Sequence, residues 1–89
     1  MDIGRVVCSI FGHDEGFYMV VVGERADGLL VANGKQRKLE NPKLKNIKHL
    51  LVTEYFVETE QLQSNKKLRK AIYSLMGKYK EEIICQKKI

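Results

Sequence analysis

The sequence predicts a mainly β fold: a small, strongly bent antiparallel barrel of about five strands with an amphipathic helix at its C-terminal end. Three observations support this prediction. The chain has 89 residues, which is enough for one domain with one core. Short apolar segments alternate with glycine, asparagine and aspartate turns up to residue 52. A single apolar stripe at helical spacing then follows Ser64.

The first two strands flank a loop that is bounded by glycines. Residues 4–11 alternate between two faces, as a strand does. Gly12 and Gly16 enclose a short polar loop. Residues 17–24 form the second expected strand, which is apolar on both faces.

Two glycine dipeptides mark the next turns. Asp27-Gly28 is expected to supply the positive φ of a tight hairpin, and Asn33-Gly34 predicts a type I′ turn. Asn41-Pro42 then interrupts the strand pattern. We therefore expect strands at residues 29–32, 35–40 and 47–52, the second of them a polar, cation-rich edge, and an exposed basic loop at residues 43–46.

Residues 64–77 predict the C-terminal helix. Ser64 is a good N-cap, and Gly77 is a suitable residue to end the helix. The apolar positions between them form one stripe: Leu68, Ala71, Ile72, Leu75 and Met76. We divide the single domain into a barrel at residues 1–54 and a segment at residues 55–89 that comprises a linker, the helix and a tail packed on the barrel.

Charge is distributed unevenly along the chain, whose formal net charge is +5. Residues 1–33 contain two basic and five acidic side chains, whereas residues 34–89 contain 14 basic and six acidic ones. This segregation favours a polyanionic partner, and nucleic acid in particular. The longest apolar run, residues 17–22, is far shorter than the roughly twenty residues that span a bilayer, so no membrane partner is expected.

No catalytic, cofactor or metal site is expected. Cys8 and Cys85 form no CxxC pair, and no His/Cys spacing suits zinc. Asp14 and Glu15 are adjacent but have no nameable base or nucleophile beside them, and no phosphate loop of the GxxxxGK type occurs. The prediction is a cytoplasmic protein that is not an enzyme and takes no small-molecule substrate.

Two basic clusters and one histidine are candidate contacts for a polyanion. The alternative for the first cluster is a solvated edge strand and loop, and for the second the solvated face of a helix. His49 is either a residue of the barrel rim or a contact. The first cluster contains Lys35, Arg37, Lys38, Lys43, Lys45 and Lys48, and the second contains Lys66, Lys67, Arg69 and Lys70.

Several of these segments resemble a known family. The run GRVV at residues 4–7, then Gly12 and the pair EG at 15–16, resembles a KOW motif. The runs NGK at 33–35, RK at 37–38 and NPKLKNIKHL at 41–50 are similar to the archaeal and eukaryotic ribosomal protein family fourteen-e and to its short bacterial relatives. The run SNKKLRKAI at 64–72 is similar to the capped helix that follows the barrel in archaeal members.

This resemblance implies an SH3-like barrel of the KOW type, RNA binding, and association with ribosomes or translation. The implied partners are structured RNA, above all ribosomal RNA, and ribosomal proteins. In such a motif Gly16 lets RNA approach the backbone closely. The sequence departs from the pattern at Asp14 and Glu15, where many KOW loops are basic. The competing hypothesis is a protein-interaction adaptor that binds an acidic protein surface.

Overall fold

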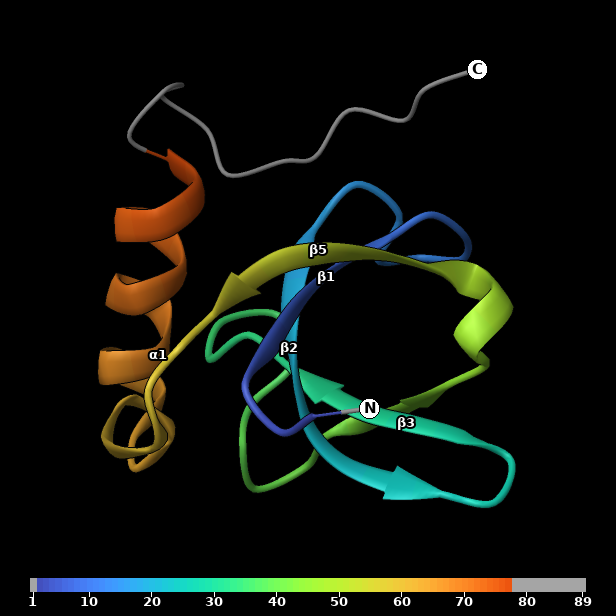
Figure 1. The fold of residues 1–89 in the computed structure, drawn as a ribbon, viewed down its shortest axis with the longest axis horizontal. Coiled ribbons are helices and arrows are strands. Elements are labelled where there is room, and N and C mark those ends of the chain that lie inside the picture. The colour runs from blue at the N-terminus through green and yellow to red at the C-terminus, as the bar shows by residue number, and fades with distance from the viewer. Residues whose placement is uncertain (1, 78–89) are drawn as a thin grey trace.

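The computed structural model describes residues 2–77, and these form a curved β-sheet with a helix beside it (Figure 1). The strands are β1 (Arg5–Ser9), β2 (Tyr18–Arg25), β3 (Gly28–Ala32), β4 (Lys43–Lys45) and β5 (Leu50–Phe56). The helical elements are the 3-10 helices η1 (Ile47–His49) and η2 (Thr59–Leu62), the α-helix α1 (Asn65–Ile72) and the π-helical turn η3 (Tyr73–Gly77). The predicted mainly β fold with a C-terminal helix is confirmed.

All five strands belong to one antiparallel sheet with the order β4-β3-β2-β1-β5. The register shifts between Arg5 and Val7 on β1 and between Val21 and Gly23 on β2. Such bulges bend strands, and the sheet curls strongly in Figure 1. Within residues 2–77, β4 and β5 are the edge strands and do not pair with each other, so the sheet is open.

Both faces of the central strands are buried, which explains why β2 is apolar on both. On one face Val6 and Val20 pack against Leu68 and Ile72 of α1. On the other face a second cluster fills the inside of the curl: Val7, Met19, Val21, Leu29, Val31 and Leu50. The predicted packing of the helix stripe on the sheet is therefore confirmed. The predicted tail beyond Gly77, with Cys85, lies outside the described residues.

The start of α1 follows the sequence prediction. The Ser64 hydroxyl accepts a hydrogen bond from the backbone N–H of Lys67 at 3.1 Å, which satisfies one of the free donors of the first turn. After Ile72 the chain widens into the π-helical turn η3, which reaches Gly77. No helix within the described part of the chain is long and apolar enough to cross a membrane.

The predicted strand at residues 35–40 is wrong, because the Asn33 side chain organises this segment as a loop. Its Oδ1 accepts the backbone N–H groups of Lys35 and Arg37, each at 3.0 Å. The type I′ turn is also wrong. That turn needs positive φ at both central residues, and only Gly34 has it, with φ 79°.

The segment after Pro42 also differs from the prediction. Residues 43–45 form the edge strand β4, which pairs with β3, rather than an exposed loop. The last strand begins only at Leu50, because the Asn46 side chain caps the 3-10 helix η1 by accepting the N–H of Lys48 at 2.9 Å. Competition from short polar side chains of this kind commonly diverts a chain from strand to turn.

The Asp27-Gly28 turn forms without a positive φ at Gly28. The glycine is required for another reason. A Cβ atom at this position would lie 2.4 Å from the backbone oxygen of Lys45 on the neighbouring strand. Gly28 therefore permits the close approach of β4 to β3.

Candidate nucleic-acid interface

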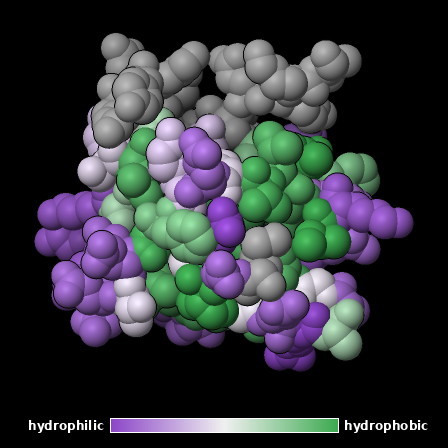
Figure 2. Space-filling model, in the orientation of Figure 1, coloured by the Kyte–Doolittle hydropathy of each residue, from purple (hydrophilic) through white to green (hydrophobic). Residues whose placement is uncertain are grey.

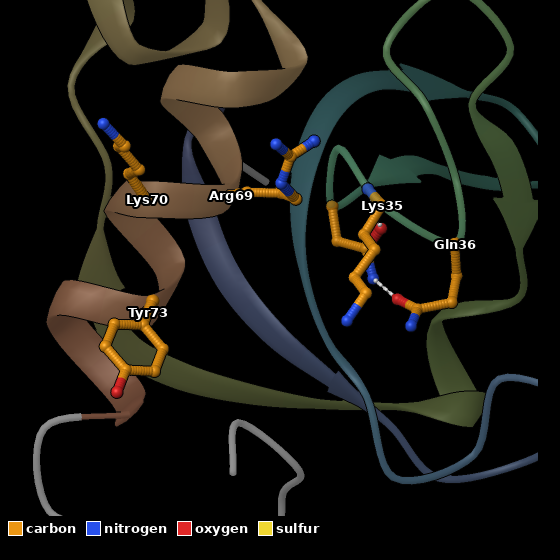
Figure 3. A pocket seen from close by; sticks show the side chains of 6 residues that line it. Lys35, Gln36, Arg69, Lys70 and Tyr73 are labelled. Atoms are coloured by element: carbon orange, nitrogen blue, oxygen red, sulfur yellow. Dashed lines mark hydrogen bonds between the residues drawn. The ribbon is translucent and has the colours of Figure 1, made fainter. Parts of the chain in front are cut away.

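A groove of about 420 Å³ lies between the loop at residues 33–37 and α1. In Figure 3, Lys35 and Gln36 extend from the loop, while Arg69, Lys70 and Tyr73 extend from the helix and its π-helical end. Asn33 completes the lining. The groove thus unites Lys35 of the first predicted basic cluster with Arg69 and Lys70 of the second.

Buried Asn33 fixes the shape of the loop. Its Oδ1 holds the backbone of Lys35 and Arg37, and its Nδ2 donates to Oε1 of Gln36 at 2.8 Å, the dashed bond in Figure 3. The N–H groups of Asn33 and Gly34 both donate to the carbonyl of Arg37, at 2.8 and 3.0 Å. Because the loop closes on itself, Lys35 and Gln36 have defined positions at the groove.

Two further contacts fix the loop to the helix. Arg69 Nη1 donates to the carbonyl oxygen of Gly34 at 3.1 Å. Asn65, the first residue of α1, accepts the backbone N–H of Leu39 and donates to Oε1 of Glu40, each at 2.8 Å. The hydrogen bond from Asn65 lowers the pKa of the exposed Glu40 carboxyl. The two walls of the groove are therefore tied together before any partner binds.

Among the described residues, no ion pair neutralises the positive charge of the groove. Lys35, Arg69 and Lys70 are exposed, and within residues 2–77 none of them forms an ion pair. Tyr73 is 53% exposed. The groove thus presents three cations and one accessible aromatic ring to solvent, which are the side chains that proteins use against nucleic acids.

A second, smaller hollow of about 160 Å³ extends the basic surface past the loop. Arg37 and Lys43 line it together with His13 and Asp14 from the loop at residues 12–16, and the Asp14 carboxylate is paired with Lys45. Gln36 lines both hollows, so they are adjacent. A basic path therefore runs from Lys70 on α1 to Lys43 on β4.

Lys45 is not on this path, and its predicted exposure is wrong. The side chain is only 5% exposed, and its Nζ donates to the Phe11 carbonyl at 2.6 Å and to Oδ1 of Asp14 at 2.9 Å. The same Asp14 oxygen accepts the Ser9 hydroxyl at 2.8 Å. Lys45 is thus a structural residue that joins β4 to the loop at residues 12–16.

This ion pair gives Asp14, one of the two acidic residues of the loop, a structural role. Burial by itself raises the pKa of the Asp14 carboxyl, but hydrogen bonds from Lys45 and Ser9 and the charge of Lys45 outweigh it, so the pKa lies below its ordinary value. Asp14 therefore stays ionised, and its carboxylate is paired with Lys45. The loop glycines, Gly12 and Gly16, have φ of 95° and 96°, which only glycine adopts readily.

The remaining predicted residues lie apart from the groove. His49 stacks on Phe11, with ring centroids 4.4 Å apart. Lys38 and Lys48 are exposed, the latter on η1. Lys66 and Lys67 are exposed in the first turn of α1 but do not line the groove.

Sequence reasoning missed Tyr73 as a site residue. The sequence feature that could have identified Tyr73 is its spacing from two predicted cations, because residues three and four apart share a helix face. Arg69 and Lys70 stand four and three residues before Tyr73. The contributions of Asn33 and Gln36 depend on the loop geometry and have no comparable sequence signal.

No known protein family matches this sequence, and no curated protein is significantly similar to it. The resemblance to the ribosomal protein family fourteen-e therefore stays a prediction. Among the described residues, no three His, Cys, Asp or Glu side chains come together as ligands for a metal ion.

Proposed function

We propose that the protein is an RNA-binding module of the KOW type that acts in the cytoplasm with ribosomes or the translation apparatus. The observation that carries the proposal is the groove between the loop and α1, with Lys35, Arg69 and Lys70 on its walls. The protein binds its partner rather than transforming it. Its targets are structured RNAs, ribosomal RNA among them, read mainly through backbone charge and shape.

The chemistry of the path supports a phosphate backbone as the ligand. Arg37 can present its planar guanidinium to two phosphate oxygens at once, while Lys35, Lys43 and Lys70 act as point charges. Each contact releases condensed counterions from the RNA, which is the main sequence-independent source of affinity. A path of several cations across two hollows suits a linear polyanion better than a single small anion.

One observation favours a protein-interaction adaptor as the second candidate, although with an apolar partner in place of the acidic protein surface that the sequence predicts. The edge strand β5 exposes Leu51, Val52, Tyr55 and Phe56 to between 38% and 48%. Figure 2 shows hydrophobic side chains gathered across the middle of one face, with hydrophilic ones around them. Exposed apolar surface on an edge strand is typical of protein-binding sites. This surface would serve an apolar partner, whereas the groove suits a polyanion.

The test compares two double substitutions on the full chain. Lys35→Gln with Lys70→Gln removes two cations from the groove, and Lys66→Gln with Lys67→Gln removes the same charge from the first turn of the same helix. At 0.15 M salt the groove pair should weaken binding of single-stranded RNA about tenfold, because each phosphate contact contributes a slope of ~0.7 in log K against log salt. The control pair should leave the affinity within about twofold.

Fluorescence anisotropy with a labelled RNA measures both affinities, and the melting temperature confirms that each variant is folded. Equal weakening by the two pairs would show that net charge, and not the groove, determines binding. A chain that binds no RNA but retains a protein partner that is lost on Leu51→Ser would establish the adaptor instead.

A further inference from the structure

The groove contains an aromatic side chain that phosphate binding does not use. Tyr73 lines it beside Arg69 and Lys70, and its ring is 53% exposed. Its position depends on the end of α1. The backbone N–H of Tyr73 donates to the carbonyls of both Arg69 and Lys70, and the π-helical turn η3 starts at this residue. Single π-helical turns of this kind are rare and occur frequently at functional sites.

The composition of the groove wall is unsuited to phosphates alone. It combines charged and polar groups with apolar surface. The aliphatic stems of the lysines and arginine and the tyrosine ring supply such surface. A flat ligand with an apolar face and a charged edge fits this combination, and a nucleotide has that structure. The volume of about 420 Å³ lies within the range of about 300–1,000 Å³ of small-molecule pockets, so there is room for one nucleotide.

Polar groups at the opposite wall can meet the edge of a base. Asn33 holds Oε1 of Gln36, which leaves the Gln36 amide nitrogen free to donate. Lys35 stands next to it on the loop. The groove thus offers hydrogen-bonding groups on its loop wall and the Tyr73 ring on its helix wall, with cations on both.

We infer that the groove binds an unpaired nucleotide of single-stranded RNA, with the base stacked on Tyr73 and the flanking phosphates contacted by Lys35 on the loop and by Lys70 on the helix. This inference rests on the proposed RNA-binding function and narrows it to unpaired segments such as loops and ends. A base inside a duplex cannot reach the ring, because its two faces are already covered by neighbouring base pairs. Stacking is tolerant of sequence, since every base has a π face.

The experiment uses the full chain and three probes: a single-stranded oligouridylate, a blunt GC-rich RNA duplex with no unpaired base, and inorganic polyphosphate, which has charge but no base. The variants are Tyr73→Leu, which removes the ring, and Tyr73→Phe, which keeps it. Tyr55→Leu, another exposed tyrosine located on β5, is the matched control. Melting temperatures verify that the three variants fold.

Tyr73→Leu should weaken oligouridylate binding about 5- to 150-fold, the range found when a stacking aromatic is removed. Tyr73→Phe and Tyr55→Leu should bind it like the unmodified chain, and polyphosphate affinity should not change in any variant. The chain has four tyrosines and no tryptophan, so stacking should also quench its tyrosine emission, and Tyr73→Phe should lose that quenching.

Two results would overturn the inference while the RNA-binding proposal stands: unchanged oligouridylate affinity in Tyr73→Leu, or duplex binding as tight as that of the single strand. Both proposals fail if no RNA binds and an acidic peptide such as polyglutamate occupies the groove. Loss of polyphosphate binding in Tyr73→Leu would also count against stacking, because that probe has no base.

Discussion

Replacing Lys45 by Met should destabilise the protein strongly. The same replacement at an exposed lysine would leave the stability unchanged. Lys45 is 5% exposed and gives hydrogen bonds to the Phe11 carbonyl and to Asp14. Without the ammonium group, the Asp14 carboxylate loses its ion pair and keeps the hydrogen bond from the Ser9 hydroxyl on Oδ1. Its Oδ2 is already buried and has no hydrogen-bond partner among the described residues.

The expected loss is about 3 kcal/mol. Removing one partner of a buried ion pair costs about 3–5 kcal/mol, because the remaining charge is left uncompensated. We take the lower end because the Asp14 side chain keeps 13% of its surface exposed and retains the bond from Ser9. For a domain of this size, about 3 kcal/mol corresponds to a fall in melting temperature of roughly 12–24 °C.

The pH dependence distinguishes this mechanism from a simple packing defect. The pKa of Asp14 is lowered in the folded state, so its contribution to stability is complete above the unfolded value and is lost as the pH falls through the lower, folded value. In Lys45→Met the hydrogen bond and the charge of Lys45 no longer lower the pKa of Asp14, while burial still raises it, so the pKa should be higher than in the unmodified chain. The stability difference between the two proteins should therefore shrink as the pH falls from 7 towards 3.

Urea denaturation of the unmodified chain and the variant, repeated at several pH values, measures these differences. Asp14→Asn in the Lys45→Met background removes the orphaned charge and should recover part of the loss. A melting temperature within a few degrees of the unmodified chain would refute the structural role of Lys45. A loss that is the same at pH 7 and pH 3 would refute the role of the Asp14 charge.

Two further substitutions test how the groove is built, and two more concern other parts of the fold. Gly34→Ala should both destabilise the chain and weaken RNA binding, because φ is 79° and a Cβ would lie 2.5 Å from the backbone oxygen of Asn65. Thermal melts measure the loss of stability, and fluorescence anisotropy measures the loss of RNA affinity. Asn65→Ala should cost about 1–3 kcal/mol in urea denaturation, since it leaves the N–H of Leu39 without its bond, and a cost near zero would mean that water replaces it. Gly28→Ala should lower the melting temperature through displacement of β4 and should weaken RNA binding less than Gly34→Ala does, because β4 carries only Lys43 of the basic path. Leu68→Ala should cost about 2–5 kcal/mol, because Leu68 is fully buried between α1 and the sheet, and a smaller cost would indicate that the helix is dispensable for the core.

The sequence predicts the parts of the fold that depend on local periodicity. Only one arrangement of each element buries its apolar residues. This holds for the alternation in β1, the apolar run of β2 and the stripe of α1. The Ser64 side chain fixes the helix start by accepting a hydrogen bond from Lys67 in the first turn. Such signals lie within a few residues of one another, so they can be recognised without the structure.

The parts that escaped prediction depend on partners distant in the sequence. On β4 the alternation favours Leu44 inside and Lys45 outside, yet Leu44 is 40% exposed and Lys45 is buried. The pairing of Lys45 with Asp14, 31 residues away, decides the orientation. The groove likewise needs Arg69 to reach Gly34 across 35 residues. Neither pair has a periodic pattern that could reveal it.

The salt dependence of RNA binding tests the central claim most directly, because it reports how many phosphates the protein neutralises. Log K for a single-stranded oligouridylate should fall linearly with log salt for the unmodified chain. The slope should be shallower by ~1.4 in Lys35→Gln with Lys70→Gln, at ~0.7 for each phosphate that is no longer neutralised, and unchanged in Lys66→Gln with Lys67→Gln. Identical slopes for all three proteins would contradict the account, since Lys35 and Lys70 would then touch no phosphate.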